Sequence, residues 1–155
     1  MEFTIKGEFY SGLNVYKNNE LLLYSKFKHR WFRGDLISVF DKDDNLLIEV
    51  SESGMWDDKY LIRYQNKDLL ATILFLSRNE IMFSGNIKFK LSQTWVILLN
   101  PFAKIYYEEK EIARVNLKRF MTIRQFSLQL KDENFIYIDN LLIYFLLNQT
   151  SNNFG

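Results

Sequence analysis

Apolar and polar residues alternate along most of this chain, and this alternation restricts its possible folds more than any other feature. Residues 87–92 are IKFKLS, and residues 126–131 are FSLQLK. A period of two places every second side chain on the same face of a β-strand. Roughly a dozen such runs, each bounded by Asn, Asp, Gly or Lys, predict a mostly β chain.

Four segments share one plan: an aliphatic and aromatic pair or near-pair, a polar tip, and a second apolar run. They are Val15-Tyr16 to Leu21, Val39-Phe40 to Leu46, Ile62 to Tyr64 to Leu69, and Ile105-Tyr106 to Ile112. Their tips are KNNE, KDDN, QNKD and EEKE, and Asn and Asp favour turns because they tolerate left-handed backbone. We expect four β-hairpins, and hence a meander or a closed barrel built from related units.

The C-terminal segment breaks this pattern. From Asp139 the chain is DNLLIYFLLNQT, in which Asp139 could cap a helix that is apolar on nearly every side and must therefore be surrounded by protein. The alternative is a further hairpin that turns at residues 139–140, because a short apolar run does not separate helix from strand. The apolar stretch 141–147 is too short to span a bilayer, which takes about 20 residues.

Composition and motifs favour one non-enzymatic domain over residues 1–155. The chain is 48% hydrophobic, and its net charge of +1 gives no general attraction to nucleic acid. It has no cysteine, no glycine-rich nucleotide loop and a single histidine, His29, so we expect no catalytic residues, no cofactor and no metal. The alternating N-terminus, MEFTIKGEF, is unlike a signal peptide and predicts a cytoplasmic location.

The spacing of an EF-hand calcium loop occurs once. Side chains with oxygen atoms fill its first, third, fifth, ninth and twelfth places, as Asp41, Asp43, Asn45, Glu49 and Glu52. The sixth place, where that loop needs glycine, is Leu46, and residues 46–50 alternate as a strand does. We expect a solvated turn followed by a strand, without calcium binding.

The densest basic and aromatic cluster is KFKHRWFRGD, residues 26–35. On a strand, Lys26, Lys28 and Arg30 would project from one face, with Phe27, His29 and Trp31 on the other. We identify Lys26, Lys28, Arg30 and Arg33 as a candidate site for an anionic headgroup or phosphate. The alternative is a solvated strand whose charges deter edge pairing. Lys118, Arg119 and Arg124 form a second, weaker cluster.

These features together resemble the tubby C-terminal-like superfamily, which includes tubby, the LURP-one-related proteins and the phospholipid scramblases. The resemblance covers about residues 3–149 and rests on three features: the aromatic-turn-leucine hairpins, the segment KFKHRWFRGDLISVFDKDDNLL, and the apolar DNLLIYFLLNQ. It implies a closed antiparallel barrel of about twelve strands around a hydrophobic C-terminal helix. The cysteine cluster of lipid-modified scramblases is missing, and Asp44 stands where the family commonly has glycine.

We therefore expect a non-enzymatic β-barrel that binds an anionic phospholipid or phosphoinositide surface, peripheral to a membrane, through residues 26–33. One alternative is an interaction or structural domain whose partner is a protein. Another is a barrel that holds an apolar small molecule, because 17% of the residues are aromatic, although aromatic side chains also fill barrel interiors.

Overall fold

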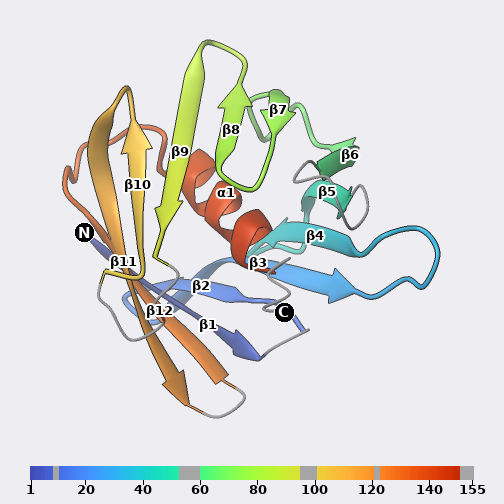
Figure 1. Ribbon diagram of the computed structural model, residues 1–155, viewed down its shortest axis with the longest axis horizontal. Helices are drawn as coiled ribbons and strands as arrows, with labels where there is room; N and C mark the ends of the chain where they lie inside the picture. Colours follow the sequence, from blue (N-terminus) through green and yellow to red (C-terminus); the bar gives the residue numbers. More distant parts are fainter. Residues whose placement is uncertain (9–10, 53–59, 95–100, 121–122, 151–155) are drawn as a thin grey trace.

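A computed structural model describes residues 1–8, 11–52, 60–94, 101–120 and 123–150, with backbone alone for residues 119 and 120. These residues form twelve strands and one C-terminal helix (Figure 1). The elements are β1 Glu2–Glu8, β2 Asn14–Lys17, β3 Glu20–Lys28, β4 Leu36–Asp41, β5 Leu46–Glu52, β6 Tyr60–Gln65, β7 Ile73–Leu76, β8 Glu80–Phe83, β9 Ile87–Gln93, β10 Ala103–Tyr107, β11 Lys110–Phe120, β12 Ile123–Leu130 and α1 Ile138–Thr150.

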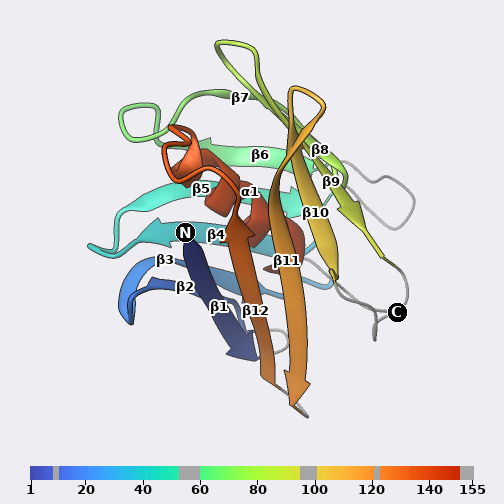
Figure 2. The same ribbon diagram turned by 90° about the vertical axis from the view of Figure 1, so that its left-hand side faces the viewer.

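All twelve strands belong to one antiparallel sheet that curls into a nearly closed barrel (Figure 2). Neighbours in the sheet are neighbours in the chain except where β1 pairs with β12, and the order is β6-β5-β4-β3-β2-β1-β12-β11-β10-β9-β8-β7. The prediction of a mostly β, twelve-stranded antiparallel barrel with a C-terminal helix is confirmed, the barrel being nearly rather than fully closed.

Three of the four predicted hairpins form, as β2–β3, β4–β5 and β10–β11. In each, the register shifts at the aliphatic and aromatic pair, between Val15 and Tyr16, Val39 and Phe40, and Ile105 and Tyr106. Such a bulge increases the local twist of the strand. The repeated residue pair therefore marks a repeated backbone irregularity close to each turn.

The hairpin predicted for residues 62–69 does not form. β6 pairs with β5, β7 pairs with β8, and these two strands are the two edges of the sheet. The polar tip that follows β6 does turn the chain. However, the chain then crosses the seam of the barrel, the gap between the edge strands β6 and β7, and does not form a return strand paired with β6. Leu69, predicted to lie on that return strand, is more than half exposed.

A side chain joins the two edges of the seam where the backbone does not. Gln65, at the end of β6, donates from Nε2 to the Ala71 carbonyl oxygen at 2.8 Å. Its Oε1 accepts the Ile73 amide at 3.1 Å. One carboxamide thus supplies a donor and an acceptor in place of two ladder bonds, and it holds the start of β7 beside the end of β6.

We predict that Gln65→Ala lowers the free energy of unfolding by about 1–2 kcal/mol, because two partly buried hydrogen bonds are lost. Amide exchange at Ile73 should also accelerate. Gln129→Ala is the matched control, because Gln129 is an exposed carboxamide for which the described residues provide no hydrogen bond. Equal stability of the two variants would show that Gln65 does not close the seam.

Helix α1 occupies the barrel interior (Figure 2), which confirms the helix and excludes the alternative hairpin. Every residue from Leu141 to Thr150 is buried, on all sides of the helix. Inward side chains of the strands surround it, and the ring centroids of Phe145 and Phe126 lie 5.3 Å apart, edge to face. A helix of this composition is stable only inside a protein shell.

The last turn of α1 is polar, and the barrel wall provides matching groups. Arg124, only 2% exposed, points inward from β12 and donates to the Gln149 carbonyl oxygen at 3.0 Å. A cation near a helix C-terminus also interacts favourably with the helix dipole. Thr150 Oγ1 lies 2.6 Å from the hydroxyl oxygen of Ser25 in β3, and Asn148 donates to the Arg78 carbonyl oxygen. These contacts fix how far the helix enters the barrel.

We predict that Phe145→Ala destabilises the protein by about 3–5 kcal/mol, because it leaves a cavity between the helix and β12. The control is Ile136→Ala, since Ile136 is 80% exposed and its truncation should change stability by no more than about 0.5 kcal/mol. Denaturant unfolding measures both. A loss at Phe145 no larger than the control would mean that the helix contributes little to the core.

Candidate anion-binding edge

The basic and aromatic cluster does not continue as a strand along its whole length. β3 ends at Lys28, and residues 29–35 form a turn that projects beyond the barrel before β4 begins (Figure 1). The predicted alternation therefore fails after Lys28. His29 and Trp31, expected on the same strand face as the half-buried Phe27, are both exposed, and Trp31 is 86% exposed.

Arg30 and Asp35 hold this turn together from within. The Arg30 guanidinium donates from Nε to the Gly34 carbonyl oxygen at 2.9 Å and from Nη2 to the Arg33 carbonyl oxygen at 3.1 Å. The buried Asp35 carboxylate accepts the Arg30 amide at 3.3 Å, and the same oxygen lies 2.7 Å from Nδ1 of His29. Arg30 is therefore first a structural residue of the turn.

The turn is anchored to the end of β5. Gly34 has a φ of 71°, and a side chain there would meet the Glu52 carbonyl oxygen at about 2 Å, so only glycine fits. The Glu52 amide donates to the Asp35 carbonyl oxygen at 3.1 Å. The Phe-Arg-Gly-Asp sequence thus encodes a tight backbone contact between two neighbouring strands.

Three of the four candidate residues, Lys26, Lys28 and Arg33, are exposed, whereas Arg30 is half-buried. Within the described part of the chain, none of these three forms an ion pair, and the nearby Asp35 is occupied by His29 and Arg30. The ammonium of Lys26 lies 5.0 Å from the ring centroid of Phe40, which orients it by a cation–π contact. The structure therefore gathers these cations along β3 and its turn.

Asp44, in the β4–β5 turn, is bound to a side chain of β3. The Tyr24 hydroxyl donates to Asp44 at 2.6 Å, and this hydrogen bond, with desolvation, raises the pKa of Tyr24 to about 12. Asp44 has a φ of 65°, which explains why glycine would suit the position. Asp44 therefore ties the β4–β5 turn to β3, and within the described residues it forms no ion pair.

The calcium-like segment is a turn and a strand, as expected. Asp41 accepts the amides of Asp43 and Asn45, each at 2.9 Å, and the side-chain amide of Asn45. Desolvation alone would raise the pKa of Asp41, but the bonds from Asn45 and Asp43 lower it below its ordinary value. Glu49 and Glu52 lie along β5, and no cluster of three or more His, Asp or Glu suited to a metal occurs among the described residues.

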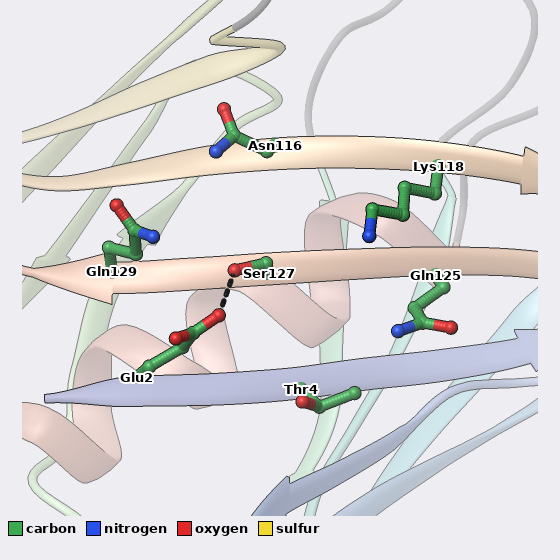
Figure 3. Close-up of a pocket in the computed structure, with 7 residues that line it drawn as sticks. All are labelled: Glu2, Thr4, Asn116, Lys118, Gln125, Ser127 and Gln129. Atoms are coloured by element: carbon green, nitrogen blue, oxygen red, sulfur yellow. Dashed lines mark hydrogen bonds between the residues drawn. The ribbon is translucent and has the colours of Figure 1, made fainter.

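A polar hollow of about 290 Å³ lies on the outer face of β1, β12 and β11 (Figure 3). It is lined by Glu2, Thr4, Asn116, Lys118, Gln125, Ser127 and Gln129, without an aromatic side chain. Lys118, from the second basic cluster, lies here, while Arg124 of that cluster points into the barrel and the Arg119 side chain is outside the described residues. That cluster therefore does not form a single surface patch.

Comparison with protein-family models, with curated protein sequences and with solved structures finds no match to this chain. The resemblance to the tubby-like superfamily and the absence of enzymatic activity accordingly stay predictions. Among the described residues, no helix has the length and apolar character needed to cross a bilayer.

Glu52, beside the turn, provides a test of the local electrostatics. Burial, and then the charge of Asp35, raises the pKa of the Glu52 carboxyl above its ordinary value of 4.5, although Arg78 offsets part of this. The folded protein therefore binds this proton more tightly than the unfolded chain, and stability falls as pH rises from 4.5 through the raised pKa.

We predict that Glu52→Gln raises the melting temperature at pH 7 and leaves it unchanged near pH 4, where the native carboxyl is already protonated. Glu20→Gln, at an exposed position, is the control and should have no such pH-dependent effect. An equal increase in melting temperature at both pH values would contradict a raised pKa for Glu52.

Proposed function

We propose that this protein is a non-enzymatic binding module that attaches to anionic phospholipid surfaces through the turn edge formed by Lys26, Lys28, Arg30 and Arg33. The observation that carries the proposal is the group of exposed cations Lys26, Lys28 and Arg33, which have no ion-pair partner within the described residues. Lys26 and Lys28 lie at the end of β3, and Arg33 lies on the turn that projects beyond the barrel. Since the net charge is only +1, attraction to an anionic surface must come from a local patch of this kind.

The expected strength follows from the number of available charges. Each Lys or Arg near an anionic membrane contributes about 1 kcal/mol. Arg30 already donates to two carbonyl oxygens of its own turn, so three residues remain to contact lipid directly. Together they correspond to about 3 kcal/mol, or roughly a hundredfold in affinity, at low ionic strength.

We predict that the protein co-sediments with vesicles containing phosphatidylserine but not with pure phosphatidylcholine vesicles, and that added salt weakens the binding. Changing Lys26, Lys28 and Arg33 together to Glu should reduce the affinity at low salt at least a hundredfold, because attraction becomes repulsion.

The control triple variant changes Lys42, Lys67 and Lys110 to Glu. These lysines are exposed, and strand register places them at the opposite end of the barrel. Both variants change the net charge equally, so the control should bind nearly as the unmodified protein does. Loss of binding in both variants would indicate only a general charge effect and would contradict a site at residues 26–33.

A protein partner is a second candidate function, favoured by exposed apolar side chains at the seam. Leu61 and Tyr64 of β6, Leu69 of the connection and Leu74 of β7 are each more than two-fifths exposed. Apolar side chains that are exposed together on one surface often mark protein contacts. The third alternative, an internal apolar ligand, has less support because α1 occupies the barrel interior.

A further inference from the structure

The tip of the β3–β4 turn carries two large apolar side chains in full contact with solvent. Trp31 is 86% exposed and Phe32 is 99% exposed, the highest values among the large hydrophobic residues that the structure describes. Single exposed apolar residues are common on protein surfaces, but two adjacent aromatic residues on a projecting turn present an apolar surface that favours removal from water.

The turn holds these two side chains outward before any partner is bound. Arg30 closes the turn beneath them through the carbonyl oxygens of Arg33 and Gly34. The Trp31 ring packs edge-on against the His29 ring, with centroids 5.3 Å apart, and His29 is itself fixed by Asp35. A partner that buries the tip therefore has less conformational entropy to remove than it would from a flexible loop.

Charge and shape indicate the class of partner. In the chain, the aromatic tip is followed directly by exposed Arg33 and preceded by exposed Lys28, the last residue of β3. Trp and Phe are enriched at the boundary between lipid headgroups and acyl chains, where neighbouring cations remain level with anionic headgroups. The convex tip with its cationic border therefore matches a bilayer surface, which is also the partner that the charged edge selects.

We propose that Trp31 and Phe32 insert into the headgroup and acyl boundary of an anionic bilayer, so that membrane attachment has an apolar component that salt does not screen. This inference rests on the proposed function and adds a mode of binding to it. It also distinguishes a membrane from a soluble phosphate or a free headgroup, neither of which could bury two aromatic rings.

Trp31 itself reports on the insertion. Addition of vesicles of phosphatidylserine and phosphatidylcholine should shift the tryptophan emission to shorter wavelength, and lipids brominated on the acyl chain should quench it. In Trp31→Phe the shift should disappear while binding is retained, because phenylalanine still inserts. The chain has three tryptophans, so this variant assigns the signal to Trp31 without altering the others.

The binding test replaces both tip residues by serine. Trp31→Ser with Phe32→Ser should weaken vesicle binding at least tenfold, and by about the same factor in about 150 mM salt as at low salt, because salt screens only the electrostatic component. The matched control is Leu61→Ser with Leu74→Ser, which removes two exposed apolar side chains from the seam. The control should bind as the unmodified protein does, and thermal melts confirm that each variant is folded.

The outcomes separate this inference from the proposed function. If vesicles bind but the emission is unchanged, or the serine variant binds as tightly as the unmodified protein, insertion is wrong and the electrostatic proposal stands. A shift of equal size on neutral vesicles supports insertion and contradicts the requirement for anionic lipid. If no vesicle binds even at low salt, both are overturned, and a pocket on a protein partner becomes the explanation for the exposed tip.

Discussion

The packing of α1 inside the barrel is the contact on which the rest of this structure depends. In a barrel of eight strands, the inward side chains can fill the interior by themselves. A barrel of twelve strands is wider, and its interior needs a further element to fill it. Here the buried faces of residues 141–150 fill that space. Without the helix, the inward residues of the strands would line a void or the barrel would collapse. The helix follows all twelve strands in the sequence, so the barrel core can be completed only when the last described segment is in place.

The polar end of the helix explains why its position is unique. Apolar packing alone leaves the helix some freedom to shift along the lumen, because van der Waals contacts depend less sharply on direction than hydrogen bonds do. Three polar contacts remove this freedom, since displaced partners would be buried without hydrogen bonds. They are Arg124 to the Gln149 carbonyl oxygen, Ser25 with Thr150, and Asn148 to the Arg78 carbonyl oxygen. Buried polar groups here determine register, while the apolar surface supplies the driving force.

Much of this fold could be predicted from residue patterns, and the errors have identifiable causes. The alternation of apolar and polar residues correctly predicts which side chains face inward wherever a strand continues, as in β9 and β12. It fails at Trp31, because Gly34 and Asp35 turn the chain and end the period of two. The charge of Arg124 places it in a surface cluster, whereas alternation along β12 puts it on the inward face, where it donates to a helix carbonyl 25 residues away in the chain. The third hairpin fails because closure of the barrel, a global property, determines the partner of β6. Composition predicts the candidate site, but the division between structural Arg30 and exposed Lys26, Lys28 and Arg33 depends on how the turn folds back on itself.

The strands of the barrel also anchor the turn at residues 29–35. Residues 29–35 have no strand partners of their own, yet Asp35 and Gly34 tie them to the end of β5 through backbone contacts with Glu52. An exposed loop would normally average over many conformations, and its charges would be spread in space. Here Arg30 and the buried Asp35 carboxylate form hydrogen bonds within the turn, and these bonds fix the backbone that carries the aromatic residues and Arg33. Because the net charge of the whole protein is close to zero, binding at the proposed edge would depend on this local arrangement and not on the overall field.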